Sequence, residues 1–307
     1  MDYLDYYQEN GYVIYENLVP DPKIDQVLTA LQTFKEKRPP YYSQSIHSWI
    51  RPEISNDGFM TESMENFTQL MINCGLKDAG NKVILGSEIS DVLKTLNPLF
   101  DEFVLWQNML FDRSTGTVDH YDSWYLDTLP RGHLTAAWIA LEDIEPDCGP
   151  FRVFPGSHKY FAAGQHDLLT HDDFVKKCRE YSESHEYKPA LLKKGSVLFW
   201  HPCLLHGALN PSVSGLSRKS LTAHYYPLGM AKKYAPQWDK VKSPRQFMMR
   251  LVNAASYPRQ INNSAIYCDR GPIDRLRYNS GLLSFAKNQL TGQYKVQMDM
   301  RRRSYGD

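Results

Sequence analysis

Short apolar segments separated by turn residues dominate the chain from residue 102 onward. The segments are apolar or aromatic, and Gly, Pro, Asp or Asn stands between neighbours; they cover residues 102–111, 134–141, 151–154, 196–200 and 220–226. Strands of this length at this spacing are typical of an all-β sandwich or barrel. The pattern therefore predicts a mainly β protein whose core strands are flanked by helices.

The first hundred residues have a different, mostly helical pattern. Residues 12–15 predict a short strand. Asp21 can cap a helix with Pro22 in its first position, and apolar residues then repeat at helical spacing. Residues 89–96 form a second amphipathic segment that stops before a proline. Between the two helices, residues 40–60 are irregular and aromatic.

The remaining segments complete a single predicted domain. Residues 168–184 indicate an inserted surface helix, and further helices are expected near 244–254 and 275–290. The chain has no internal repeat, low-complexity tract or linker. We therefore expect one domain over residues 1–307, made of a helical part (about 1–100), a β core (about 101–227) and a mixed C-terminal extension (about 228–307).

Charge and cysteine usage narrow the class of protein. The 35 basic residues equal the 35 acidic ones, so net charge supports neither a nucleic-acid partner nor a membrane surface, and the basic run 301–303 is interpreted as a solvated tail. The five cysteines form no CxxC pair, which argues against a disulfide framework or zinc ribbon. Because the sequence has neither a signal-peptide pattern nor 18 consecutive apolar residues, we expect a cytoplasmic protein. We also expect its substrate to be a small molecule. Its oligomeric state stays open.

One short motif indicates a metal centre. His120 and Asp122 are separated by a single residue, and His206 follows 86 residues after His120. In an extended strand, residues i and i+2 project to the same side, so the pair could chelate one ion. Two imidazoles and one carboxylate are the ligand set of non-haem Fe(II) sites that keep open positions for dioxygen and a second molecule. His201 is the competing histidine, and we interpret it as a residue flanking a strand.

Several further motifs accompany these residues in order along the chain. They are residues 7–13, residues 148–158, residues 195–200, His206-Gly207 with Asn210, and Arg218 twelve residues after His206. In this order they resemble the phytanoyl-CoA dioxygenase family of Fe(II)- and 2-oxoglutarate-dependent oxygenases. The resemblance covers residues 5–227, whereas residues 228–307 match nothing that we can assign.

The resemblance implies a double-stranded β-helix, the cupin-like jelly roll, with Fe(II) held by His120, Asp122 and His206. Arg218 would lie on a strand next to His206 and bind the distal carboxylate of 2-oxoglutarate, because a guanidinium offers a pair of parallel N–H donors. O2 would convert 2-oxoglutarate to succinate and carbon dioxide while an unactivated carbon of the substrate is hydroxylated or otherwise oxidised. Related halogenases carry a small residue in place of the carboxylate, so Asp122 favours hydroxylation.

Other residues are weaker candidates for binding. Gln107 would contact 2-oxoglutarate if it, rather than Trp106, points inward, and Thr135 and Trp138 on the following strand are further cosubstrate candidates. The segment 41–53 could close over the pocket. The candidate substrate-binding residues, each with strand packing, scaffold or solvent exposure as the alternative, are Tyr121, Trp124, Tyr125, Arg152, His47 and Trp49.

Two other functions are compatible with a jelly roll that carries these ligands. A binding protein could keep the shell without the chemistry, but the three ligands and Arg218 are all present. A zinc hydrolase could use two histidines and a carboxylate, but it leaves Arg218 unexplained and lacks an evident general base. Metal analysis and succinate release separate these possibilities from an oxygenase.

Overall fold

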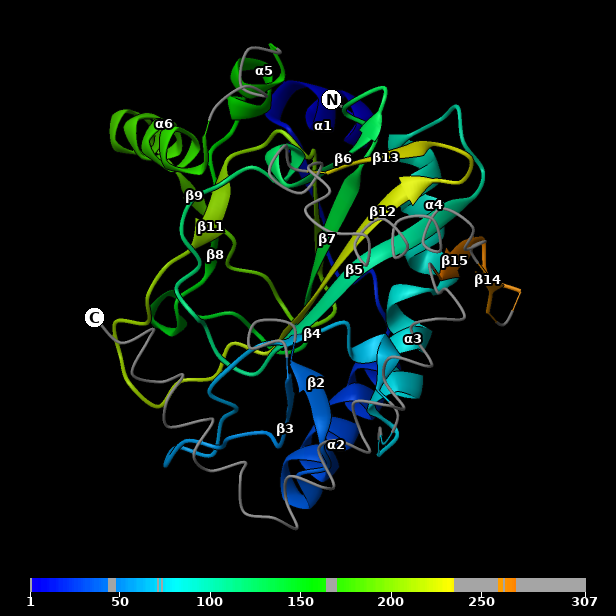
Figure 1. Ribbon diagram of the computed structural model, residues 1–307, viewed down its shortest axis with the longest axis vertical. Helices are drawn as coiled ribbons and strands as arrows, with labels where there is room; N and C mark the ends of the chain where they lie inside the picture. The colour runs from blue at the N-terminus through cyan, green and yellow to red at the C-terminus, as the bar shows by residue number, and fades with distance from the viewer. Residues whose placement is uncertain are drawn as a thin grey trace, which may run out of the picture.

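In the computed structural model, four of the five apolar segments pair into one large sheet at the centre of the molecule, and the segment at residues 151–154 joins a smaller sheet (Figure 1). The structure describes residues 2–43, 48–70, 72, 74–163, 170–234, 259–261 and 263–268. In sheet order the strands are β1 (Tyr12–Tyr15), β10 (Val197–Trp200), β7 (Thr135–Ala140), β12 (Ser220–Pro227), β5 (Phe103–Phe111), β15 (Ile266–Cys268) and β14 (Arg259–Gln260), with β4 (Met64–Glu65) also paired to β5. All pairs are antiparallel except β15 with β5.

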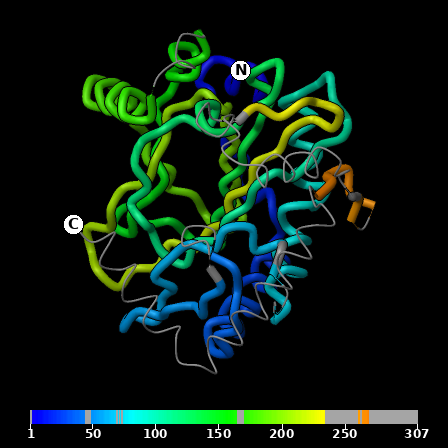
Figure 2. The backbone as a smooth tube through the Cα atoms, viewed as in Figure 1, coloured from blue at the N-terminus to red at the C-terminus, as the bar shows by residue number. Residues whose placement is uncertain are grey.

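A smaller sheet faces the large one. It consists of β11 (His206–Ala208), β8 (Phe151–Val153) and β9 (Lys188–Pro189), in that order. The tube trace shows these segments opposite β7, β12 and β5 (Figure 2). Aromatic and aliphatic side chains from both sheets form a shared core that includes Trp138, Phe151 and Trp200. Two sheets enclosing such a core form the predicted jelly roll, and the mainly β fold class is confirmed.

Three helices cover the outer face of the large sheet: α2 (Asp21–Lys37), α3 (Leu76–Ile84) and α4 (Ser87–Leu96). The strand β7 shows how one sheet serves two cores, because successive side chains point to opposite faces. Ala137 and Ile139 belong to the cluster under the helices, whereas Ala136 and Trp138 belong to the interior cluster. All six residues of β7 are buried as a result.

The remaining elements surround this framework. The helix α1 (Tyr3–Asn10) precedes β1, and a hairpin of β2 (Tyr41–Ser43) and β3 (Ser48–Ile50) lies next to α2 (Figure 1). A third aromatic cluster joins α5 (Ser157–Ala162), α6 (His171–Ser184) and the 3-10 helix η2 (Asp122–Trp124). The other elements are η1 (Phe67–Gln69), β6 (Leu126–Leu129) paired with β13 (Ala231–Tyr234), and η3 (Pro146–Cys148).

Most predicted elements are confirmed, with local corrections. The strand at residues 12–15 occurs as β1, the helix expected after Asp21 occurs as α2, the amphipathic segment 89–96 lies in α4, and the inserted helix occurs as α6. Asp21 is the first residue of α2 rather than its cap, because Pro20 takes the cap position without a side-chain hydrogen bond. The irregular stretch 40–60 contains the β2–β3 hairpin.

The C-terminal extension adds two short strands to the main sheet, since β15 pairs with β5 and β14 pairs with β15. The helices expected near 244–254 and 275–290 lie outside the described residues, so the single domain over 1–307 stays a prediction. Within the described residues, no helix is both long and apolar enough to cross a bilayer.

Candidate metal centre

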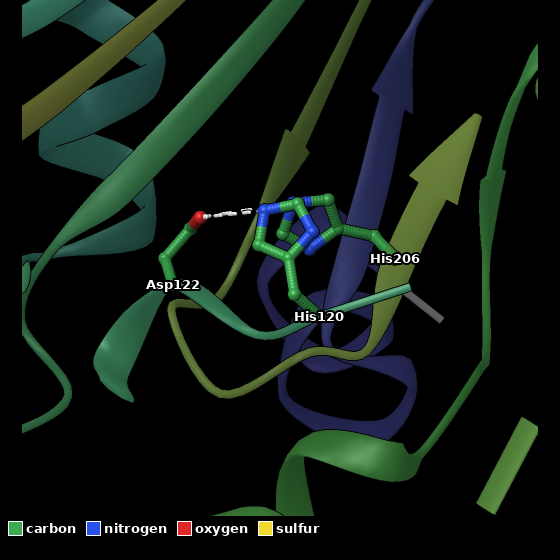
Figure 3. Close-up of side chains that lie close together, drawn as sticks. All are labelled: His120, Asp122 and His206. Carbon is green, nitrogen blue, oxygen red and sulfur yellow. Dashed lines mark ion pairs between the residues drawn. The ribbon is translucent and has the colours of Figure 1, made fainter. Parts of the chain in front are cut away.

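The side chains of His120, Asp122 and His206 lie close together (Figure 3). One ligand atom from each lies within 4.8 Å of the others. The Nε2 atoms of His120 and His206 are each 3.7 Å from Oδ1 of Asp122. The three atoms are close enough together that they could hold one divalent ion such as Fe(II).

The backbone fixes the two histidines against each other. His120 and His206 form an isolated antiparallel bridge, in which each backbone N–H donates to the other's carbonyl oxygen at 2.9 Å. His120 is therefore extended, but Asp122 begins the 3-10 helix η2, so the predicted extended strand through both residues is wrong. The turn nevertheless brings the Asp122 carboxylate back toward the two imidazoles.

The hydrogen bond at Nδ1 of each imidazole determines which ring nitrogen is available to a metal. Nδ1 of His120 lies 2.8 Å from the carbonyl oxygen of Val118, and Nδ1 of His206 lies 2.9 Å from that of Leu204. A carbonyl oxygen can only accept, so each Nδ1 carries the proton and each Nε2 keeps its lone pair. Orientation of ligating histidines by backbone carbonyls is typical of metal sites.

Electrostatics favour the protonation states that a metal needs. Burial by itself raises the pKa of the Asp122 carboxyl, but His206, His224 and His120 outweigh burial and hold the pKa well below its ordinary value. Burial lowers the pKa of His206 to about 4, although the Asp122 carboxylate opposes the change. At neutral pH the site therefore offers an ionised carboxylate and a neutral imidazole.

Arg218 is a buried cation with unpartnered donors. Its side chain is 2% exposed, and its Nε and Nη2 atoms have no hydrogen-bond partner among the described residues. The guanidinium lies 5.1 Å from the ring centroid of Phe111 and 5.7 Å from that of Trp138. Burial lowers its pKa to about 10, which leaves it charged at neutral pH. Such a group fits a buried carboxylate as its partner.

The position of Arg218 corrects one expectation. The residue lies two positions before β12, which pairs with β5 and β7, whereas His206 lies on β11 of the smaller sheet. Arg218 is therefore not on a strand next to His206. Aromatic rings connect the two instead, because Phe151 stacks on Trp138 at 5.4 Å and lies 5.3 Å from the ring of His206.

The strand register places the three predicted cosubstrate residues on different faces. Gln107 pairs with His224, whose Nε2 is 3.4 Å from Oδ2 of Asp122, so Gln107 points to the interior. Trp138 also points inward, beside Arg218. Thr135 points to the opposite face of β7, where its hydroxyl accepts a hydrogen bond from Asn97 at 3.0 Å. Gln107 and Trp138 are thus brought to the site, and Thr135 is not.

The aromatic residues around Asp122 divide in a similar way. The Tyr121 ring stacks on Phe161 at 4.6 Å, and the Trp124 ring stacks on Phe174 at 4.5 Å, so both are buried against α5 and α6. Tyr125 instead lies 6.0 Å from the ring of His120. Of the three, only Tyr125 is placed beside a metal ligand and partly open to solvent.

The remaining candidates lie away from the metal ligands or outside the described residues. Trp49 is buried on β3, with its ring 6.3 Å from that of Tyr42, and His47 lies outside the described residues. His201 does not join the ligand cluster, and its Nδ1 accepts a hydrogen bond from the backbone of Cys203 at 3.1 Å.

Arg152 has an internal partner. Its Nε and Nη2 donate to the two oxygens of Asp119 at 2.8 and 2.7 Å, which makes a bidentate ion pair. The Arg152 guanidinium, a candidate for binding the substrate, is therefore already paired with a carboxylate. Asp119 directly precedes His120, and Arg152 is paired on β8 with Gly207 of β11. The ion pair therefore ties the loop that carries one metal ligand to the strand beside the other.

Gly207 is required by this close packing. A methyl group there would contact the Asp119 carboxylate and approach the backbone oxygen of Thr117 to 2.9 Å. We expect Gly207→Ala to destabilise the protein by about 1–3 kcal/mol, because packing of this kind relaxes only by moving backbone. Metal binding should weaken as well, since His206 is the next residue. Urea unfolding and metal titration test this, and unchanged values for both would contradict the packing argument.

Two residues near Asp122 were not predicted from the sequence. Nε1 of Trp200 donates to Oδ2 of Asp122 at 2.8 Å, and the ring of His224 lies beside the same oxygen. Trp200 belongs to the predicted strand at residues 196–200, but its direction depends on the register with β7. The sequence holds no signal for this contact except that both side chains sit on inward positions.

Comparisons with known proteins agree with the fold and identify the family. The model of the family described as phytanoyl-CoA dioxygenase (PhyH) matches residues 7–220. Human peroxisomal phytanoyl-CoA dioxygenase is 23% identical over 235 residues, which are 72% of this chain and 66% of the human protein. A Caenorhabditis elegans homologue of phytanoyl-CoA dioxygenase domain-containing protein 1 is 22% identical over 273 residues. The match covers 76% of this chain and 91% of the homologue.

Solved structures show the same fold. The α-ketoglutarate-dependent carbocyclase SnoK of nogalamycin biosynthesis superposes with a TM-score of 0.56 at 18% identity, covering 80% of this chain and 89% of SnoK. Iron-bound EctD from S. alaskensis superposes with a TM-score of 0.53 at 17% identity, covering 73% of this chain and 75% of EctD. The family model spans well over half of the residues, and the motifs that predicted the family lie within the matched region. The chain therefore belongs to the phytanoyl-CoA dioxygenase family.

Proposed function

We propose that this protein is an Fe(II)- and 2-oxoglutarate-dependent dioxygenase that hydroxylates an unactivated carbon of a small organic molecule. The observation that carries the proposal is the convergence of His120, Asp122 and His206 at one point, with Arg218 buried and two of its nitrogens without a partner among the residues that the structure describes. Relatives support the cofactors, since SnoN was crystallised with Fe3+ and α-ketoglutarate and EctD with 2-oxoglutarate.

The residues fit this set of cofactors. Three protein ligands leave about three positions of an octahedral ion open, enough for the keto acid and dioxygen. Besides the carboxylate that would bind the ion, 2-oxoglutarate carries a second carboxylate that needs a partner. Arg218 would bind that carboxylate through Nε and Nη2, which have no partner within the described part of the chain, in an interior walled by Trp138 and Phe111, where little water competes.

The protein's own part in the reaction is to bind and orient. Iron and 2-oxoglutarate, once bound, supply the oxidant. Arg218 fixes the orientation of the cosubstrate, and the rings of Phe151 and Trp200 exclude water around His206. Gln107 would contact 2-oxoglutarate through its amide, and Tyr125 would contact a substrate near the metal.

Hydroxylation is the reaction that the ligand set favours, because Asp122 occupies the position of the carboxylate ligand. Solved structures with the same fold are named as a carbocyclase and an epimerase, so the experiment must identify the product. Gln107 and Tyr125 are uncharged at neutral pH, and burial raises the pKa of Tyr125 to about 12. We therefore propose a free small molecule as the substrate rather than an acyl-CoA.

The function is tested by anaerobic addition of Fe(II) and 2-oxoglutarate, followed by oxygen and a panel of candidate substrates. We expect the metal–keto acid charge-transfer absorption on binding, and substrate-dependent succinate with an oxidised product on turnover. Binding without succinate from any substrate would indicate a binding protein. Tight zinc binding with hydrolysis and no keto acid binding would indicate a zinc hydrolase.

A further inference from the structure

The two oxygens of the Asp122 carboxylate have different surroundings. Oδ1 faces the two imidazoles, at 3.7 Å from Nε2 of both His120 and His206. Oδ2 points away from them and accepts a hydrogen bond of 2.8 Å from the indole Nε1 of Trp200. Nε2 of His224 lies 3.4 Å from Oδ2, too far for a strong hydrogen bond. Trp200 is therefore the main partner of Oδ2.

Which oxygens bind the metal decides how many positions remain for the reactants. A carboxylate that binds through one oxygen uses one position, whereas one that binds through both oxygens uses two. With two histidines, the first mode leaves about three open positions and the second about two. A keto acid that chelates through two atoms then leaves room for dioxygen only in the first mode.

We propose that Trp200 is a positioning residue that keeps Asp122 a one-oxygen metal ligand and thereby preserves the coordination position for dioxygen. The proposal rests on the proposed function, in which His120, Asp122 and His206 hold iron. An indole suits this role because its N–H is a donor only, so it can never compete with Asp122 for the metal.

The Trp200 ring is held firmly enough to define the carboxylate orientation. The side chain is 1% exposed, at the end of β10. Its ring lies 5.1 Å from Phe151, 5.0 Å from His206 and 5.8 Å from His224. Packing on several sides leaves the indole little freedom to turn away, so the hydrogen bond to Oδ2 is preorganised before metal binds.

The test compares Trp200→Phe with Trp138→Phe. Both tryptophans are buried in the same cluster on neighbouring strands, but Nε1 of Trp138 has no hydrogen-bond partner among the described residues. Anaerobic Fe(II) affinity is measured by competition with a chelator, without cosubstrate. We expect Trp200→Phe to weaken Fe(II) binding about 10–100-fold, as loss of a group that orients a ligand does, and Trp138→Phe to leave it unchanged.

A crystal structure of the metal-loaded wild-type protein provides a second measurement that does not depend on any variant folding. One Asp122 oxygen on the metal, with Oδ2 still on Trp200, supports the proposal. Both oxygens on the metal would overturn it. Equal Fe(II) affinity of Trp200→Phe and wild type would overturn it too, while leaving the proposed function intact. Failure of the wild-type protein to bind Fe(II) at all would instead reject the proposed function.

Discussion

Asp122→Ala should abolish coupled turnover and weaken Fe(II) binding by more than about 100-fold, since a ligand matters more than the groups that merely orient it. The substitution removes the anionic member of the cluster and leaves His120 and His206 facing each other at a ring separation of 4.4 Å. Anaerobic metal titration and succinate release measure the two effects.

The fold should survive this change. Asp122 is buried among three histidines, and its backbone hydrogen bonds do not depend on its side chain. Asp143→Ala is the matched control, because it removes a surface carboxylate paired with Lys193 at 2.7 Å and should leave metal binding unchanged. Normal turnover by Asp122→Ala, with a native melting temperature, would reject the metal centre.

Arg218→Ala should chiefly weaken binding of 2-oxoglutarate. Charge-assisted hydrogen bonds in a buried site contribute about 3 kcal/mol, which corresponds to a dissociation constant about 100-fold higher. Fe(II) affinity should stay unchanged, because Arg218 contacts Phe111 and Trp138 rather than the ligands. Titration of the metal-loaded protein with 2-oxoglutarate measures the change, and an unaltered affinity would contradict the role of Arg218.

A second substitution separates the charge of Arg218 from its volume. Arg218→Met keeps an unbranched side chain but removes a buried cation whose Nε and Nη2 have no partner among the described residues. We expect the ligand-free variant to melt at a higher temperature than the wild type, because an unpaired buried charge is costly. The same variant should bind 2-oxoglutarate as weakly as Arg218→Ala. A lower melting temperature would indicate that the guanidinium has structural partners.

The predictions that succeeded from sequence depended on residue identity at short spacing. His120 and Asp122 are close along the chain, so they meet whether the backbone between them is extended or, as observed, turns into a 3-10 helix. The predicted strands were found because strand formation follows local apolar patterning. The side-chain direction of Gln107 could not be predicted, because it depends on strand pairing and not on local patterning. A register shift between β12 and β5 at His224/Tyr225 breaks simple alternation, and it arises only when the two strands pair.

Residues whose role depends on a distant partner could not be assigned from sequence. Arg152 looked available for a substrate anion, but Asp119, 33 positions away, satisfies it. Tyr121 and Trp124 flank the metal ligands in sequence, yet helices α5 and α6 provide their packing partners. Trp200 contacts Asp122 across 78 positions. In each case the deciding partner belongs to another element, and local propensity carries no information about it.

Motifs and local apolar patterning were enough to predict the family and a mainly β chain, and the family resemblance then implied the jelly roll and the candidate metal ligands. The folded chain was needed to establish which face of each strand lines the interior, which cations are already paired, and which oxygen of Asp122 faces the two imidazoles. Those outcomes depend on register and on packing between distant segments, since a shift of one residue reverses every side chain on a strand.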